Sequence, residues 1–548
     1  MSQPTGGMNR LTWWAKRLTR RYPSDAGIDA IRADLLGAQA AGATVPQGNS
    51  VVAVECVENT FYFGLFSVLC QKMRALTGAQ CDLVVVRSVS GAIGTRWTHW
   101  LARSSLLGSI ISAQWMRAFR FAVERVAFRS QSWSHPVSDL GDWIRSHRLW
   151  LRLRSDQDLA ALGILGVPVG DLISDTYLRF CPAPRIDVRD PFVRRLIWQA
   201  YRDIRRARSY FRTRRPRLYL TSYSTYVEHG VPVRVALQEG VRVCSFGNFV
   251  QFGRELTASD WFHTPDTSDY RATFQTLEHQ EDRLRAAEEQ LRGRLSGSLD
   301  AAMSYMRVSA YAAGTEPVPD VGGAVVVFLH DFYDSPHVYD GMIFHDFWAW
   351  TCFTIDTLKA SGRKFWVKPH PNQISLSGEV LQDLRAKYPD LPMLSPRITN
   401  VQLVDAGMVC GVTVYGTVGH ELAYLGVPTI ASAKHPHHSF DFCRTAHTVE
   451  QYRQFLQTAE KLPLSKEEMS RQALAFFYMH NLFGGDETLT LRSRYAAFWK
   501  DCHSPDASDA VLVQRLRDLS EAPGFEQQVM RMVDSLGGRG ERGVSWTS

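Results

Sequence analysis

Features that define several common protein classes are missing from this sequence of 548 residues. Stretches without a charged side chain, such as the 15 residues Ala406–His420, contain polar groups, whereas a helix that crosses a bilayer needs about 20 apolar residues. The first 23 residues hold arginines and tryptophans but no apolar core typical of a secretion signal. We therefore expect neither a membrane-spanning segment nor a secretory signal.

Cysteine is sparse, and its spacing follows no known framework. The nine cysteines are scattered without any C-x-x-C pair. This pattern excludes a disulfide framework, argues against structural zinc and favours reduced thiols in a cytosolic compartment. The apolar fraction of 45% excludes a wholly disordered chain, and ordinary domain sizes predict two or three domains.

Net charge is also modest, at +7, but the positive charge is unevenly placed. Residues Pro191–Arg217 contain ten arginines against one aspartate. The stretch is typical of a solvated helix face, or of a surface that meets anionic lipid headgroups or an anionic polymer. No zinc-finger spacing or aromatic RNA-binding motif accompanies the arginines, so nucleic acid is not expected as a partner.

Hydrophobic periodicity predicts an α/β fold in the first half of the chain. A buried strand at Val51–Val57, a helix at Phe61–Leu76 and a strand at Cys81–Val86 form a βαβ unit, which implies a parallel sheet. Residues 95–150 are predicted to be helical. Further strands are predicted at Leu218–Thr221 and Val241–Phe246, with a helix before Gly240.

The second half repeats the alternation of strands and helices. Strands are predicted at Ala324–Leu329, Lys364–Lys368, Gly407–Cys410 and Thr429–Ala431. The intervening helices are predicted at Phe344–Ser361, Gly378–Tyr388 and Gly419–Leu425. The fold class is therefore α/β, with two Rossmann-like doubly wound domains and helical insertions.

The segment Lys364–Asn372, KFWVKPHPN, is the first motif with chemical content. Its apolar strand ends in Lys368 and His370, and prolines stand on both sides of the histidine. Ligands of open parallel sheets bind beyond the carboxyl ends of the strands. A cation and an imidazole held there suit a phosphate or pyrophosphate, and the alternative is a capped histidine in a proline-rich turn.

The second motif is Val414–Ile430, VYGTVGHELAYLGVPTI, in which a strand is followed by a glycine-rich turn and a helix. Free backbone N–H groups at the start of a helix, together with the Thr417 hydroxyl, form a typical anion site. The residues expected to line it are Gly416, Thr417, Gly419, His420 and Glu421. Alternatively, Glu421 is only a favourable charge in the first turn of its helix.

These two motifs together resemble the nucleotide-binding half of GT-B glycosyltransferases of bacterial capsule and surface-polysaccharide biosynthesis. They are also similar to polysialyltransferases and to CDP-glycerol glycerophosphotransferases. The resemblance implies that His370 contacts the donor phosphate, that Thr417 and the turn at 416–420 contact the phosphates, and that Glu421 contacts the ribose. Tyr415-Gly416-Thr417 departs from the family's pair of hydroxyl residues.

The resemblance implies a metal-independent, inverting glycosyltransferase in which two domains face a cleft. Its donor is a nucleotide sugar, CMP- or UDP-linked, with no other cofactor, and its acceptor is a glycan or lipid-linked glycan. The expected location is cytoplasmic and peripheral at the inner membrane face, on an anionic surface. The alternatives are transfer of a CDP-linked polyol phosphate, a non-catalytic module that binds nucleotide sugar or polysaccharide, and a sugar-nucleotide epimerase.

This interpretation divides the chain into five parts. They are a leader at 1–50, an acceptor-side Rossmann-like domain with a helical insertion at 51–265, a helical connection at 266–320, a donor domain at 321–500, and one helix with a disordered tail at 501–548.

Other polar residues are expected at the same sheet edges. His330 opens a loop after the first strand of the donor domain and is assigned to the donor side, and His437 lies in a histidine cluster on the same edge. A metal in the loop at 330–337 is an alternative that we do not favour, because one loop rarely supplies converging ligands. The general base in the first domain has several candidates, which are Glu58, Asp171, Asp175, Glu228 and His229.

Overall fold

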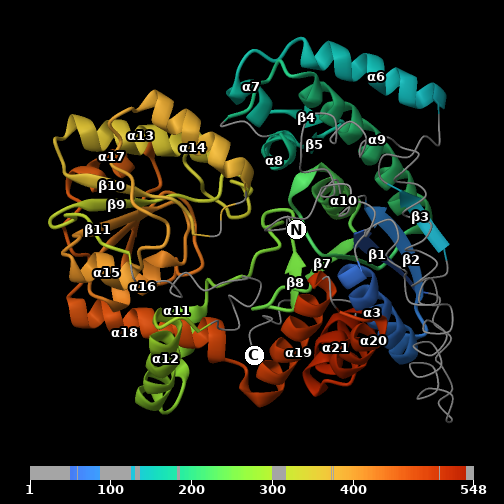
Figure 1. The fold of residues 1–548 in the computed structure, drawn as a ribbon. Coiled ribbons are helices and arrows are strands. Elements are labelled where there is room, and N and C mark those ends of the chain that lie inside the picture. The colour runs from blue at the N-terminus through green and yellow to red at the C-terminus, as the bar shows by residue number, and fades with distance from the viewer. Residues whose placement is uncertain are drawn as a thin grey trace.

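The computed structural model describes residues 50–57, 60–86, 125–129, 136–181, 185–298, 316–371, 373, 375–504 and 507–537. Within these ranges the chain forms two α/β domains, each built on a mainly parallel sheet (Figure 1). The expected fold class, two Rossmann-like doubly wound domains, is therefore confirmed. None of the helices described is both long and apolar enough to cross a membrane.

The N-terminal domain contains a six-stranded sheet in the order β3-β2-β1-β6-β7-β8. The strands are β1 (Val51–Val57), β2 (Gln80–Val86), β3 (Arg125–Arg129), β6 (Leu218–Thr221), β7 (Arg242–Phe246) and β8 (Gly253–Leu256). Neighbouring strands are parallel except β7 and β8, which are antiparallel. The strand order reverses between β1 and β6, and in such sheets ligands bind beyond the carboxyl ends at that point.

Helices cover both faces of this sheet. They are α3 (Thr60–Thr77), α6 (Pro136–Trp150), α7 (Asp156–Ala160), α8 (Gly170–Phe180), α9 (Pro191–Arg214) and α10 (Tyr226–Gln238). Side chains of α8, α9 and α10 share one apolar core with β1, β2, β6 and β7. On the other face, α3 forms a second core with the same sheet. The short hairpin of β4 (Gly163–Ile164) and β5 (Val167–Pro168) precedes α8.

The C-terminal domain contains a fully parallel five-stranded sheet in the order β10-β9-β11-β12-β13. Its strands are β9 (Val325–Phe328), β10 (Phe365–Lys368), β11 (Cys410–Thr413), β12 (Thr429–Ala431) and β13 (Cys443–Thr445). The helices are α13 (Phe347–Ala360), α14 (Ser375–Lys387), α15 (Asn400–Asp405), α16 (Val418–Tyr424), α17 (Val449–Gln457) and α18 (Lys466–Phe477). Here the strand order reverses between β9 and β11, which places the expected binding edge beside β10 and α16.

The connecting helices pack on the C-terminal domain, and the last helices of the chain pack on the N-terminal domain. The connecting helices α11 (Tyr270–Thr276) and α12 (Gln280–Leu295) share an apolar core with α18 of the C-terminal domain. The last helices α19 (Gly485–His503), α20 (Asp509–Ser520) and α21 (Pro523–Gly537) return to the N-terminal domain and cover α3 (Figure 1). Residues beyond 501 were expected to hold one helix, but they form two, because both carry apolar stripes that are buried against α3.

Two predicted elements need correction. The stretch at 95–150 was predicted to be helical, but β3 lies within it, and its pairing with β2 adds a third parallel strand. The part of that stretch at 95–124 lies outside the described residues. The strand predicted at Gly407–Cys410 begins at Cys410, because Gly407 adopts a φ of 87° in the turn after α15. The strands at Leu218–Thr221 and Thr429–Ala431 have their predicted bounds.

Candidate functional site

The end of β10 places Lys368 and His370 at the carboxyl edge of the C-terminal sheet, as the sequence predicted. Lys368 is buried, its Nζ lies 3.4 Å from Oδ1 of Asn400, and burial lowers its pKa to about 8. His370 follows two residues later and is half-buried. Burial and the neighbouring Lys368 lower the pKa of His370, which Asp331 partly opposes. His370 is therefore a neutral imidazole near pH 7 and would act on a phosphate through its N–H group.

The turn between β11 and α16 lies on the same edge. The Gly416 N–H donates to Thr413 Oγ1 at 3.2 Å, and Thr417 begins α16 without a side-chain capping bond. His330, after β9, lies beside this turn, with its Nε2 3.2 Å from the same hydroxyl. Its ring stacks on Phe347, and burial lowers its pKa to about 3. His330 thus supports the turn as a neutral ring.

Glu421 of α16 is held by two partners that sequence reasoning missed. Its Oε2 accepts a hydrogen bond from Asn400 Nδ2 at 2.8 Å, and its Oε1 lies 2.7 Å from an Arg294 guanidinium nitrogen. Arg294 comes from α12, far away in the sequence, and its side chain is buried. Asn400 therefore links Lys368 to Glu421. The guanidinium of Arg294, from the connecting helix, balances the negative charge of the carboxylate. The expected contact of Glu421 with a ribose stays a prediction.

His420 and His437 do not reach the surface of this edge. Both are buried, and their rings pack against Phe476 at centroid distances of 5.0 and 5.5 Å. Gly419 allows this close approach, since a Cβ atom there would lie 2.4 Å from Nε2 of His437. The expectation that these two histidines and Gly419 line a donor site is corrected, because they form the core beneath α16.

The N-terminal sheet brings together a carboxylate and an imidazole at its reversal point. Glu55 of β1 and His229 of α10 are both buried, and Oε1 of Glu55 lies 2.8 Å from Nδ1 of His229. The other carboxylate oxygen accepts hydrogen bonds from the Thr221 hydroxyl at 2.9 Å and from the Ser222 N–H at 2.8 Å. These partners fix the carboxylate, and the carboxylate fixes the imidazole ring.

The charge states of this pair follow from burial and mutual attraction. Burial alone would lower the pKa of His229, but the charge and hydrogen bond of Glu55 outweigh it and raise that pKa above 6.5. Burial likewise opposes ionisation of Glu55, yet His229 and Ser222 leave its pKa lowered. Among the described residues, no hydrogen bond engages Nε2 of His229.

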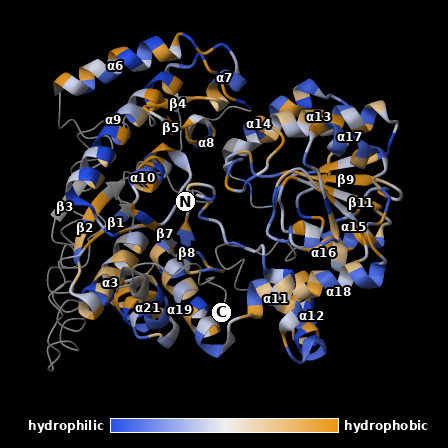
Figure 2. Cartoon of the chain, turned by 180° about the vertical axis from the view of Figure 1, so that it is seen from behind, coloured by the Kyte–Doolittle hydropathy of each residue, from blue (hydrophilic) through white to orange (hydrophobic). Residues whose placement is uncertain are grey.

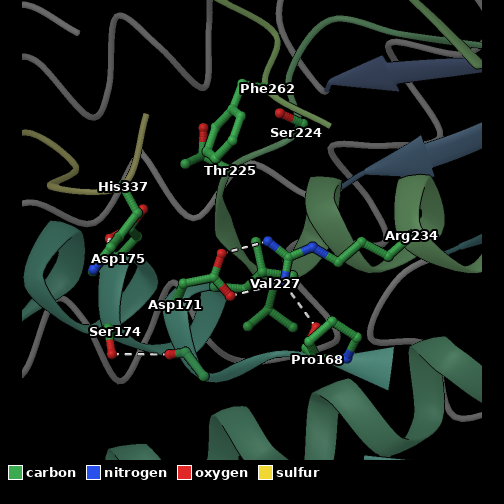
Figure 3. A network of polar contacts seen from close by, with 12 residues as sticks. Pro168, Asp171, Ser174, Asp175, Ser224, Thr225, Val227, Arg234, Phe262 and His337 are labelled. Atoms are coloured by element: carbon green, nitrogen blue, oxygen red, sulfur yellow. Dashed lines mark hydrogen bonds and ion pairs between the residues drawn. The ribbon is translucent and has the colours of Figure 1, made fainter. Parts of the chain in front are cut away.

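The structure separates His229 from the other candidates for a base. Asp171 is bound through both oxygens by the guanidinium of Arg234, which also donates to the Pro168 carbonyl at 2.8 Å (Figure 3). We correct that assignment, because a carboxylate so paired serves as a structural anchor. Glu228 is buried, and burial raises its pKa although the charge of His229 opposes this. Glu58 lies outside the described residues.

Contacts between the domains join the two sheet edges. Oδ1 of Asp175 in α8 lies 2.7 Å from Nδ1 of His337 in the loop after β9 (Figure 3). Close by, the guanidinium of Arg179 lies 3.9 Å from the centroid of the Tyr333 ring and donates to the Tyr333 carbonyl at 3.4 Å. The loop at 330–337, whose first residue was assigned to the donor side, therefore forms a contact between the domains.

The arginine-rich stretch is mainly structural. It forms α9, and at least six of its ten arginines make ion pairs with carboxylates of neighbouring elements, namely Arg202, Arg205, Arg206, Arg208, Arg212 and Arg214. Their partners include Asp139 and Asp142 on the inner side of α6. Most of the positive charge that was expected to contact an anionic surface is therefore paired with carboxylates of the protein.

No family model and no curated protein matches this chain. Solved structures with some likeness include UDP-GlcNAc 2-epimerase from Neisseria meningitidis bound to UDP-GlcNAc, at 9% identity over 89% of this chain and 99% of that chain, with a TM-score of 0.25. MurG from Acinetobacter baumannii matches at 11% identity over 77% and 94%, with a TM-score of 0.24. Thermosulfurimonas dismutans KpsC, a beta Kdo 2,4 transferase, matches at 15% identity over 47% and 79%, with a TM-score of 0.28. At these TM-scores, the fold assignment depends on the strand orders given above.

Proposed function

We propose that this protein is a glycosyltransferase that moves a sugar from a nucleotide-activated donor to a glycan or lipid-linked glycan acceptor. One observation carries the proposal, namely the buried Glu55–His229 pair at the reversal point of the N-terminal sheet. An imidazole whose Nδ1 bonds a fixed carboxylate, with Nε2 left for a substrate, has the geometry of a general base oriented by a third group.

In the proposed reaction, Nε2 of His229 accepts the proton of the acceptor hydroxyl as its oxygen attacks the anomeric carbon. The bond from that carbon to the donor phosphate breaks, and its electron pair stays on the phosphate oxygen. Glu55 stabilises the imidazolium that forms, because its carboxylate is already aligned with Nδ1. An attack from the face opposite the leaving group would invert the anomeric configuration.

The donor would bind at the edge that holds Lys368, His370 and Thr417. An N–H group and an ammonium group there would stabilise the charge that develops on the departing nucleotide. The motif resemblance at Lys364–Ile430 supports a nucleotide sugar in this place. It also supports the surface-polysaccharide subfamily, an assignment that belongs to this proposal.

Nucleotide binding and turnover test the proposal in two steps. A thermal-shift panel of CMP, CDP, UDP and GDP compounds should show one preferred nucleotide, because a ligand at about 100 times its Kd stabilises the fold by roughly 2.7 kcal/mol. His229→Gln should then lower transfer about 100-fold or more while it leaves that thermal shift unchanged. A product mass that shows transfer of a phosphopolyol would replace the proposed reaction with polyol-phosphate transfer. Nucleotide binding without any nucleotide release would indicate a non-catalytic binding module.

We also propose that the protein attaches to an anionic membrane surface, and α6 rather than α9 supports this. The polar side of α6 faces inward, where Asp139 and Asp142 meet the arginines of α9. Its apolar side chains face outward, with Val137, Leu140 and Ile144 exposed at 87%, 59% and 41%. The helix lies at the outer edge of the N-terminal domain (Figure 1), and apolar residues recur along it (Figure 2).

A helix with an outward apolar face and nearby cations is typical of binding at a bilayer interface. Arg148 and Arg152 are exposed, whereas Arg145 is paired with Asp142. Trp143 adds an amphipathic ring that is 40% exposed. Each cation close to an anionic surface contributes about 1 kcal/mol. This arrangement would bring a lipid-linked acceptor to the enzyme.

A further inference from the structure

A cluster of soft metal-ligand side chains lies under α16, apart from the proposed reaction site. His435 and His437 follow β12, and Cys443 begins β13. One ligand atom from each of these three side chains lies within 4.8 Å of the other two. All three are buried, with exposed fractions of 1%, 0% and 7%.

The ring nitrogens of this cluster are not satisfied by the protein. Within the described part of the chain, Nδ1 of His435 and both nitrogens of His437 are buried without a hydrogen-bond partner. The two rings lie 3.9 Å apart between centroids, and Phe442 stacks on His437 at 5.0 Å. A buried polar atom without a partner costs about 1–3 kcal/mol, so several in one place call for a missing ligand.

His435 is oriented as a metal ligand would be. Its Nε2 lies 2.6 Å from the hydroxyl of Thr445, and within the described residues its Nδ1 has no hydrogen-bond partner. Metal-bound histidines commonly donate their second N–H to such a partner, since this fixes the ring and its tautomer. Thr445 is in β13, two residues after Cys443, so one strand supplies both a ligand and the support of another ligand.

We propose that His435, His437 and Cys443 bind one zinc ion. A thiolate with two imidazoles is a ligand set that zinc accepts when water takes the fourth tetrahedral position, at about 2.3 Å to sulfur and about 2.0–2.1 Å to nitrogen. The Cys443 thiol releases its proton when the bond to zinc forms, and both imidazoles bind as neutral rings. The ligand atoms of the three side chains have to move slightly closer together to reach these bond lengths.

A zinc ion at this site would hold α16 in place against β13. His437 lies against Gly419 in the first turn of that helix, where a Cβ atom would be 2.4 Å from Nε2. A metal that holds His437 to Cys443 therefore connects α16 to β13. The inference does not depend on the proposed glycosyl transfer, because metal content and ligand spectra report on it without any assay of activity.

The test begins with the full-length protein, expressed without a polyhistidine tag in zinc-supplemented medium. Elemental analysis should find about one zinc per chain. After chelation, addition of Co²⁺ should give the visible bands of a tetrahedral site and a thiolate-to-cobalt charge-transfer band in the near ultraviolet. X-ray absorption at the zinc edge of the wild-type protein should show one sulfur together with imidazole nitrogens.

Cys443→Ser should abolish the charge-transfer band and lower the zinc content at least about tenfold. Cys410→Ser is the matched control, because Cys410 is a buried cysteine of β11 in the same sheet and lies outside the cluster. It should keep both the metal and the band. A wild-type protein that neither contains zinc nor gives the cobalt–thiolate band would overturn the proposal, as would an unchanged band in Cys443→Ser. The absorption spectrum of the wild type decides the matter if that variant fails to fold.

Discussion

Glu55 is the residue whose importance only the folded chain reveals. Because its charge raises the pKa of His229, the neutral imidazole needed for a general base is lost as the pH falls through a value above 6.5. Glu55→Gln removes that charge, so the acidic limb of the kcat profile should move to lower pH. The maximal kcat should fall about 100-fold, because the amide cannot stabilise an imidazolium.

Glu228→Gln provides the comparison for this pH profile. Glu228 precedes His229 in α10 and is equally buried, but no hydrogen bond joins it to the His229 ring. Because the charge of Glu228 raises the pKa of His229 less than the charge and hydrogen bond of Glu55 do, its replacement should move the acidic limb less. If the limb shifted in Glu228→Gln and not in Glu55→Gln, the residue that orients His229 would be Glu228 and not Glu55.

His370 should matter on the donor side. His370→Ala should leave the melting temperature within a few degrees of the parent, since the ring is only half-buried. Transfer should fall about 100-fold, the usual effect of losing one group that stabilises developing charge. Initial rates at saturating donor check this, and a normally folded variant with full activity would remove His370 from the donor site.

At the scale of elements, the Arg294–Glu421 pair ties α12 to α16. Glu421→Gln removes the carboxylate that pairs with the buried guanidinium of Arg294, which should lower the free energy of unfolding by about 3–5 kcal/mol. The double variant Glu421→Gln with Arg294→Met should recover most of that loss, as measured by denaturant unfolding.

Nucleotide affinity separates the two roles of this carboxylate. If Glu421 also binds the ribose, the double variant should bind nucleoside monophosphate more weakly by about 1–3 kcal/mol although its stability is restored. Parental affinity in the double variant would mean that Glu421 serves only to hold α12 against the C-terminal domain.

Helix α6 should govern membrane attachment. Leu140→Glu with Ile144→Glu removes two outward apolar side chains, each worth up to about 1.5–3 kcal/mol when fully buried, and adds repulsion from anionic lipid. Sedimentation with anionic vesicles should weaken at least about tenfold. Val511→Glu, at a similarly exposed apolar residue of α20, should bind like the parent. Equal pelleting of all three proteins would exclude α6 as the contact.

At the scale of the whole molecule, one ion pair couples the domain interface to pH. The contact with Asp175 raises the pKa of His337 above 6.5, although burial opposes this. The stabilisation from this group is therefore complete below pH 6.5 and is lost as the pH rises through the raised value. Hydrogen exchange of α8 and of the loop after β9 should accelerate over that range. In His337→Asn, hydrogen exchange of these segments should be fast both below and above the raised pKa. If exchange in this variant still accelerated with rising pH, another group would cause the pH dependence.

The sequence by itself determined most strands of the two sheets and the residues at the carboxyl edge of β10. Runs such as residues 51–54 and Thr429–Ala431 are buried on both faces, so their composition alone predicts a strand. The motif ending in Lys368 and His370 was placed correctly for a related reason. Residues that directly follow a parallel strand must lie at its carboxyl edge, wherever the strand is in the sheet.

Only the tertiary structure decided which polar residues meet. Glu55 and His229 are 174 positions apart in the sequence, and nothing local to either predicts the other. The assignment of Asp171 failed for the same reason, because its partner Arg234 comes from another helix. His435, His437 and Cys443 lack the spacing of a known zinc motif, and the argument against structural zinc considered spacing alone. Long-range pairs form where strand order and helix packing bring elements together, which a local pattern of apolar and polar residues does not specify.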